Sequence, residues 1–143
     1  MDPEQVVTTD QPEHRILTDP GCQQLVGYET RIDATGACTV RLEVQSQHLN
    51  RHGILHGGMV ATVMDVACGN TASQYFDPLG HAAVVTVALN LSYIAATGPG
   101  SVIATARPTG GGKSTVHVYG ELHDGQGSLL ATATGVFRRI GRR

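Results

Sequence analysis

The sequence predicts an α+β protein in which a curved antiparallel sheet packs around one long central helix. Two observations predict this class. Residues 57–75 are almost entirely apolar or small, over a length that suits a helix rather than a strand. A strand hairpin precedes this segment, and four β-rich segments separated by glycine-containing turns follow it. One buried helix with strands before and after it in the chain favours a sheet that wraps around the helix.

The segments before the long helix are expected to form a short helix and a hairpin. Asp19 and Pro20 are typical of a helix start, and Gly27 is typical of a helix end. Residues 28–44 follow, with a turn at 34–36 and with apolar and polar side chains in alternation. One face of this hairpin is apolar and carries Cys38, Val40, Leu42 and Val44. We therefore expect that face to line the core.

The segments after the long helix have the composition of strands and are expected to pair in an antiparallel sheet. They cover residues 81–96, 101–108, 115–124 and 128–139. A Gly-Pro-Gly turn separates the first two, and glycines mark the other connections. Residues 16–140 are predicted to form a single domain, and residues 1–15 a flexible N-terminal segment.

The loop TGGGKS, residues 109–114, invites comparison with a nucleotide-binding loop. The phosphate-loop motif G-x-x-x-x-G-K-[ST] would need glycine where the chain has Arg107, and a helix after the motif. The residues that follow, TVHVYGELHD, alternate as a strand does. We therefore predict a hairpin turn, whose lysine and backbone N–H groups could contact a phosphate group of another kind.

The composition argues against several classes of partner. A net charge of −2 over 143 residues disfavours general nucleic-acid binding and attraction to anionic membranes. No apolar run is long enough to span a bilayer, and the first residues lack the features of a signal peptide. Cys22, Cys38 and Cys68 have no metal-ligand spacing and are expected to be buried free thiols. These features predict a cytoplasmic protein without a metal site.

Asp65 is the only Asp, Glu, Lys or Arg between His52 and Phe76. Its neighbours three and four residues away in the helix are all uncharged: Ala61, Thr62, Cys68 and Gly69. An unpaired charge in a buried helix costs on the order of several kcal/mol and tends to be retained where it has a function. The alternative is that the carboxylate reaches solvent or a partner on a distant strand.

The start of the helix offers further candidate residues. Gly57 and Gly58 follow His56 where a helix has unpaired N–H groups and the positive end of its dipole. Such donors can stabilise a carbonyl oxygen that becomes negative. Asn50 could present its amide to water or to a carbonyl group. His56 is expected to form a hydrogen bond at the helix start rather than to act as a base.

Gly57 and Asp65 are eight residues apart, which corresponds to about 12 Å along a helix. This distance is too long for both residues to act on one reacting atom. Two antiparallel copies of the helix would place Gly57 of one chain opposite the partner subunit's Asp65. An active site built on these residues is therefore expected to be shared across a homodimer.

The segment LNRHGILHGGMVATVMDVACGNTA, residues 49–72, resembles the signature N-x-x-G-x-x-HGG-x-x-x-x-x-x-D of the hotdog-fold acyl-CoA thioesterases of the PaaI type. The order of the other segments is similar to that family over most of the chain. The resemblance implies a hotdog fold, paired through edge strands into a dimer and often into a dimer of dimers. It also implies hydrolysis of a thioester between an acyl group and coenzyme A, without a metal or a cofactor.

The resemblance implies roles for four catalytic positions. Asp65 matches the carboxylate that acts as general base or nucleophile, and Gly57 matches the backbone donor to the thioester carbonyl. Asn50 matches the amide that positions water or carbonyl, and Thr86 falls where related enzymes carry a hydroxyl that assists the water. Substrate contacts are implied for His56, Gly58, Tyr93, Gly111, Gly112, Lys113, Ser114 and Arg139.

A non-catalytic acyl-CoA-binding or regulatory module with the same fold is the alternative function. In such a module the costly position of Asp65 would have no explanation. Other hotdog activities are disfavoured by the sequence. Dehydratases of this fold carry an HFPG-like motif with a helix glutamate, and hydratases use an Asp–His pair on a longer motif; this chain has neither pattern.

Overall fold

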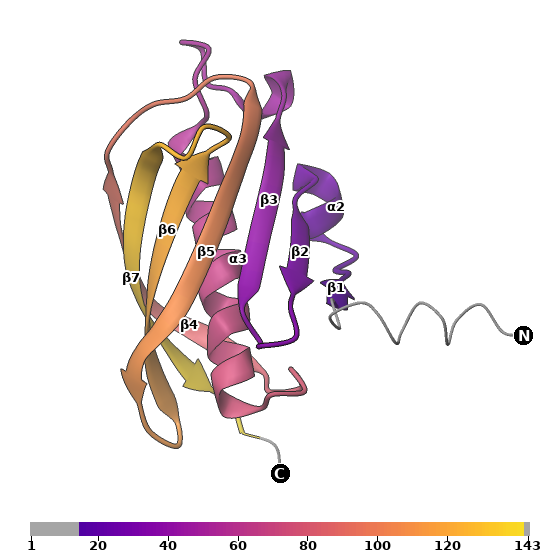
Figure 1. Cartoon of the computed structure of the whole chain (residues 1–143), viewed down its shortest axis with the longest axis vertical. Coiled ribbons are helices and arrows are strands. Elements are labelled where there is room, and N and C mark those ends of the chain that lie inside the picture. The colour runs from indigo at the N-terminus through magenta and orange to yellow at the C-terminus, as the bar shows by residue number, and fades with distance from the viewer. Residues whose placement is uncertain (1–14, 142–143) are drawn as a thin grey trace, which may run out of the picture.

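The computed structural model describes residues 15–141. A long helix and a seven-stranded antiparallel sheet confirm the predicted α+β class (Figure 1). Within this range no helix has both the length and the apolar character needed to cross a lipid bilayer. Along the chain the elements are β1 (Arg15–Leu17), α2 (Cys22–Val26), β2 (Glu29–Ile32), β3 (Cys38–Val44), the 3-10 turn η1 (Ser46–His48), α3 (Gly57–Phe76), β4 (Val84–Tyr93), β5 (Gly100–Gly111), β6 (Thr115–Asp124) and β7 (Leu129–Arg139).

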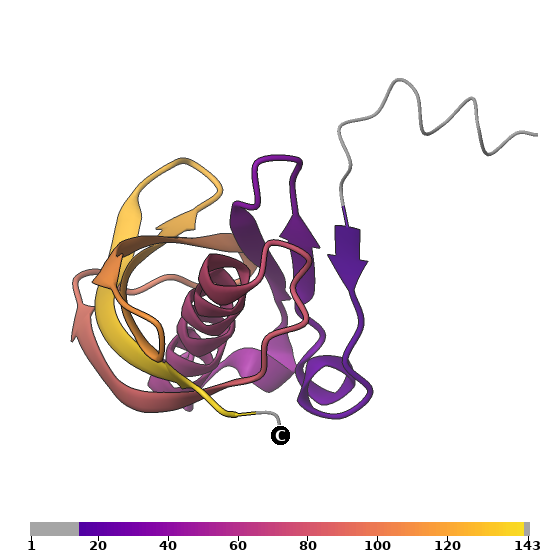
Figure 2. The ribbon, with the colours of Figure 1, turned by 90° about the horizontal axis from the view of Figure 1, so that it is seen from below.

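The sheet curves around α3. Its strand order is β1-β2-β3-β5-β6-β7-β4, and every neighbouring pair is antiparallel. Figure 2 shows α3 inside the curve of the sheet. Strand β4 follows α3 in the chain, but within residues 15–141 it pairs only with β7, so it forms one edge of the sheet. This places β4 on the opposite side of the helix from β5 (Figure 2).

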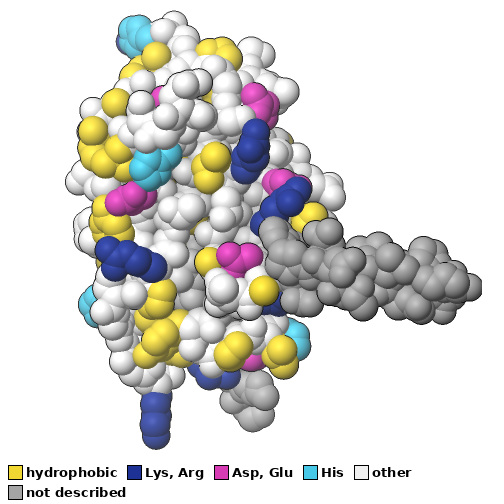
Figure 3. Space-filling view, viewed as in Figure 1, with side chains coloured by type: hydrophobic (Ala, Val, Ile, Leu, Met, Phe, Trp, Pro, Cys, Tyr) yellow, Lys and Arg dark blue, Asp and Glu magenta, His cyan; other side chains and the backbone are white. Residues whose placement is uncertain are grey.

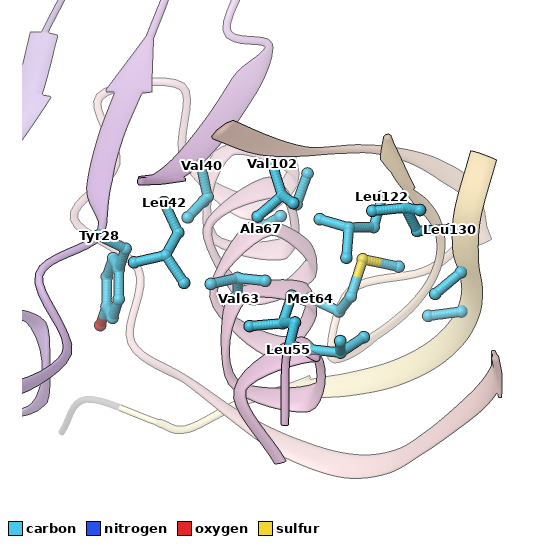
Figure 4. Packing of buried hydrophobic residues seen from close by; sticks show 14 of the residues in the cluster. Tyr28, Val40, Leu42, Leu55, Val63, Met64, Ala67, Val102, Leu122 and Leu130 are labelled. Atoms are coloured by element: carbon cyan, nitrogen blue, oxygen red, sulfur yellow. The ribbon is translucent and has the colours of Figure 1, made fainter. Parts of the chain in front are cut away.

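Helix α3 is enclosed on most sides, as its composition predicts. Every residue from Met59 to Gln74 is buried or half-buried. Val63, Met64 and Ala67 are at most 1% exposed. They pack in one cluster with residues of β3, β5 and β6, among them Val40, Val102 and Leu122 (Figure 4). Burial of this apolar surface holds the helix in the sheet.

The predicted short helix and hairpin are confirmed. Helix α2 ends at Gly27, whose φ of 94° lies in the left-handed region that glycine adopts without strain. On β3 the alternating apolar residues are at most 2% exposed and face α3: Cys38, Val40, Leu42 and Val44. The four strand segments predicted after the helix form β4 to β7.

Strand β1 was not predicted from the sequence. Arg15, assigned to the flexible segment 1–15, pairs with Ile32 of β2. The rest of that segment, residues 1–14, lies outside the described residues. Three residues are too few for an alternation of apolar and polar side chains to be recognised, so this strand depends on its neighbour β2.

The prediction of three buried thiols is wrong for one of them. Cys22 is exposed at the start of α2, whereas Cys38 and Cys68 are buried, and all three are free. Burial is the main cause that raises the pKa of Cys38 and of Cys68 to about 12. The two core thiols are therefore protonated and unreactive at neutral pH.

The outer face of the sheet carries charges of both signs. Figure 3 shows basic and acidic side chains interspersed over the face formed by β3, β5 and β6. Arg41 and Glu43 of β3 illustrate the pattern, because both contact the Ser101 hydroxyl of β5, at 2.9 and 2.6 Å. This mixed polar face lies on the opposite side of the sheet from α3, which carries the candidate catalytic residues Gly57 and Asp65.

Candidate active site

The start of α3 provides an unpaired backbone donor. His56 is the N-cap residue, and its Nδ1 accepts a hydrogen bond from the Gly58 N–H at 2.8 Å. The predicted role of His56 at the helix start is therefore confirmed. The Gly58 N–H was predicted to be unpaired, and this prediction is wrong because the cap uses it. The Gly57 N–H has no acceptor among the described residues.

A cavity of about 300 Å³ at the helix start brings together Asn50, Gly57 and Tyr93. Tyr93 lies at the end of β4, and its hydroxyl donates to the Gly57 carbonyl oxygen at 2.8 Å. The side-chain oxygen of Asn50 accepts from the N–H groups of His52 at 2.9 Å and of Ile54 at 3.3 Å, which holds the side chain in a turn. The NH₂ group of Asn50 has no partner among the described residues, so it can donate into the cavity.

Asp65 and Thr86 come together from α3 and β4. The Thr86 hydroxyl donates to Oδ1 of Asp65 at 2.8 Å. Asp65 forms no ion pair within residues 15–141, so the distant partner considered as the alternative is a neutral hydroxyl rather than a cation. A carboxylate held through one oxygen keeps the other oxygen available to water. This arrangement suits a general base.

A second cavity, of about 420 Å³, lies between α3 and the segments of β1, α2 and β2. Its lining includes Val66, the neighbour of Asp65 in α3, and Tyr28. Burial is the main cause that raises the pKa of Tyr28 to about 12, and Cys22, Asp19 and Asp65 act in the same direction. The phenol therefore keeps its proton within electrostatic reach of Asp65. The sequence carries no signal for this proximity, because a tyrosine at a strand start is typical of a core residue.

The predicted hairpin turn in the glycine-rich segment is confirmed. Strand β5 extends to Gly111, so only residues 112–114 form the turn. The Ser114 carbonyl oxygen accepts a hydrogen bond from the Arg139 N–H at 2.8 Å. A Cβ atom at Gly111 would lie 2.7 Å from the Thr115 carbonyl oxygen, closer than real contacts allow. Glycine is therefore required where the turn leaves β5.

The predicted site residues fall into separate groups along α3. Tyr93 pairs with Ala131 near the start of β7, and Val84 pairs with Arg139 at the end of β7. Ala131 and Arg139 are eight residues apart, so roughly 27 Å of strand separates Tyr93 from Arg139. The Arg139 guanidinium lies 5.9 Å from the ring of Phe76, the last residue of α3. One end therefore carries Asn50, His56, Gly57, Gly58 and Tyr93, the other carries Gly111, Gly112, Lys113, Ser114 and Arg139, and Asp65 with Thr86 lies between them.

The comparison with protein families decides the family of the chain. Residues 52–131, more than half of the sequence, match the family model of the Thioesterase superfamily. The chain belongs to the thioesterase superfamily. The matched range spans α3 and β4 to β6, and so includes Gly57, Asp65 and Thr86. Membership supports hydrolysis of a thioester or ester bond.

Similar proteins agree with this thioesterase fold. A Pseudomonas aeruginosa protein, provisionally named an esterase, is 31% identical over 108 residues, which cover 75% of this chain and 78% of that protein. The structure of the Escherichia coli PaaI protein from the phenylacetic acid degradation operon is similar with a TM-score of 0.77 and 25% identity over 86% of each chain. The structure of a Bacillus halodurans protein solved with CoA is similar with a TM-score of 0.78 and 25% identity, over 97% of this chain and 87% of that one. The predicted hotdog fold and PaaI-type resemblance are confirmed.

Proposed function

We propose that this thioesterase-superfamily protein hydrolyses an acyl-CoA thioester to a carboxylic acid and coenzyme A. The observation that carries the proposal is the hydrogen bond of 2.8 Å between Asp65 and Thr86. This hydrogen bond holds the only carboxylate of α3 in place. The first N–H of the same helix, that of Gly57, has no acceptor among the described residues. A base and an oxyanion donor are the two groups that thioester hydrolysis needs from a protein.

The proposed reaction starts with attack on the thioester carbonyl carbon. Asp65 takes a proton from the attacking water as general base, or attacks the carbon itself to form an anhydride that water then hydrolyses. The Gly57 N–H donates to the carbonyl oxygen as it becomes negative, and the helix dipole adds to this stabilisation. The C–S bond then breaks, and the leaving coenzyme A thiolate takes the proton held by Asp65, or a proton from water where Asp65 was the nucleophile. Asn50 positions the water or the carbonyl group, and Thr86 orients the carboxylate. The proposal involves no metal and no cofactor, since coenzyme A enters as part of the substrate.

The proposed active unit is a homodimer with shared sites, further paired into a dimer of dimers. Strand β4 supports it, because no strand of the described part of the chain pairs with its outer edge and residues 85–88 are all exposed, Val87 to 57%. Helix α3 and β4 run in opposite directions, since Gly57 contacts Tyr93 and Asp65 contacts Thr86. Antiparallel pairing of two β4 strands would therefore make the two α3 helices antiparallel. Gly57 would then approach the partner subunit's Asp65.

Free thiols at Cys22, Cys38 and Cys68 favour a reducing compartment, and we propose the cytoplasm. The outward-facing charges of both signs give no basic face on the side shown in Figure 3. The proposed partner is therefore a small acyl-CoA molecule rather than a nucleic acid or a membrane.

The proposal is tested by release of coenzyme A thiol from a panel of aryl, medium-chain and hydroxy-aryl acyl-CoAs. Turnover of at least one thioester that depends on Asp65 is the expected result. Saturable binding without thiol release across the panel would instead support an acyl-CoA-binding module. Absence of both binding and release would remove acyl-CoA as the ligand.

Replacement of Lys113 by Ala is expected to raise KM for acyl-CoA by about two- to fivefold, because an exposed cation contributes modestly to binding a phosphate. We propose that Lys113 and Ser114 contact the phosphates of coenzyme A. The Bacillus halodurans structure with CoA supports a ligand of this type. Steady-state kinetics should show little change with a short thioester that lacks the nucleotide. Arg41→Ala, which removes an exposed cation from β3, is the matched control. Equal effects on both substrates would contradict the contact.

A further inference from the structure

His48 occupies a buried position just before the loop that leads to α3. The residue is 3% exposed. Among the buried residues that the structure describes, it is the only one of the His, Asp, Glu, Lys and Arg types. A buried imidazole needs partners for both ring nitrogens.

The hydrogen bonds of the ring fix its protonation. Nδ1 accepts from the Gln45 N–H at 3.0 Å, so this nitrogen carries no proton. Nε2 lies 2.6 Å from the Val26 carbonyl oxygen, which can only accept, so Nε2 carries the proton. Both nitrogens are used inside the protein, and the ring is neutral. His48 is therefore not a proton donor or acceptor for a substrate.

The backbone of His48 holds the start of α3. Its carbonyl oxygen accepts from the His56 N–H at 2.9 Å. Inside the segment closed by this bond, Leu49 pairs with Leu55, and the Asn50 N–H donates to the Ile54 carbonyl oxygen at 2.8 Å. The loop that presents Asn50 is thus closed at its base by His48 and His56.

The ring links this closed loop to a separate element. Val26 is the last residue of α2, and its carbonyl oxygen is one of those that a helix end leaves without an internal partner. The His48 ring supplies that partner and, through Gln45, also closes the turn η1. Helix α2, the loop and the N-cap of α3 are therefore joined through one buried residue, His48, whose ring contacts α2 and whose backbone carbonyl contacts His56.

We propose that His48 is a positioning residue for the thioester hydrolysis: it ties the end of α2 to the loop of Asn50 and to the N-cap His56, and so fixes the direction of the Gly57 N–H. The inference rests on the proposed function. Oxyanion donors stabilise the transition state more than the bound substrate. A small misplacement of the donor therefore lowers kcat and leaves KM almost unchanged.

Two amide variants separate the two ring contacts. In His48→Gln the longer side chain places its NH₂ group near the former Nε2, so the Val26 contact is kept. In His48→Asn the shorter side chain places its oxygen near the former Nδ1, so the Gln45 contact is kept and the link to α2 is lost. We expect kcat within about threefold of wild type for His48→Gln, and at least about a tenfold loss with unchanged KM for His48→Asn.

Val40→Ala is the matched control for lost stability. Val40 is 1% exposed on β3, and its truncation lowers the free energy of unfolding without touching the loop. Its kcat should remain at the wild-type value at a temperature where every variant is folded. The inference is overturned if Val40→Ala loses kcat as His48→Asn does, or if His48→Asn retains full kcat.

Amide hydrogen exchange tests the positioning without any substrate. The His56 N–H donates to the His48 carbonyl, so its exchange should accelerate at least about tenfold in His48→Asn. The amide of Leu122, in the centre of β6, should be unaffected. Unchanged exchange at His56 overturns the inference even if kcat falls. If the wild type turns over no acyl-CoA, the proposed function fails, and the exchange rates still decide whether His48 holds the helix start.

Discussion

Asp65→Asn is expected to lower kcat for acyl-CoA hydrolysis by about two to four orders of magnitude. The amide is nearly the same size as the carboxylate, and its oxygen can still accept the hydrogen bond from Thr86. It cannot take a proton from water or attack a carbonyl carbon. Rates of coenzyme A thiol release, measured together with Tm, give the result.

Thr86 provides the matched controls for this prediction. Thr86→Ser keeps the hydroxyl that holds Asp65 and should stay within about threefold of wild type. Thr86→Val removes the hydroxyl at similar volume and should lose about tenfold, because the carboxylate remains but is less well oriented. Retention of thiol release by Asp65→Asn would show that Asp65 is neither the base nor the nucleophile.

Gly57→Pro is expected to lower kcat by about two to three orders of magnitude, the usual effect of removing one oxyanion donor. Gly57 is the first residue of α3, where proline is well tolerated in helices, and the extended backbone of His56 suits a following proline. The substitution therefore removes the unpaired N–H and keeps the helix. A Cβ atom there would lie 3.6 Å from the Tyr93 ring, an ordinary contact. Gly57→Ala adds the same atom and keeps the N–H, so it is the control.

A mixture of the two inactive proteins tests the shared site. In a heterodimer of Asp65→Asn and Gly57→Pro subunits, one of the two composite sites would keep both functional groups. Random reassociation should therefore restore about a quarter of wild-type activity. A site contained within a single chain would give no recovery, and that result would reject the dimeric arrangement.

The fold was largely predictable because its main signals are local. A long apolar stretch with Asp65 as its only charge predicts a buried helix, and alternation from Cys38 to Val44 predicts a strand with one apolar face. The edge position of β4 was not predictable, since it depends on pairing with β7 at the far end of the chain. The three residues of β1 are too few to show any period.

The site was predictable where one residue type is unusual in its surroundings. Asp65 stands out in an apolar helix, and the paired glycines after His56 stand out at its start. Contacts that join distant segments were not readable in the same way. Tyr28 lies near Asp65, and the His48 ring meets α2, only because the sheet brings these segments together. Residue types alone also could not show that His56 occupies the Gly58 N–H.

The edge strand β4 has a consequence for how this protein is made in a cell. Its ten residues, VVTVALNLSY, contain no charge and no proline, the features with which monomeric sheet proteins guard an exposed edge. In the proposed dimer the second subunit covers this exposed edge. If the proposed dimer forms, a newly folded single subunit is an aggregation hazard until it meets another, and this interval shortens as subunit concentration rises, because association is bimolecular. Dimerisation would then protect the chain from misassociation as well as complete the proposed active site.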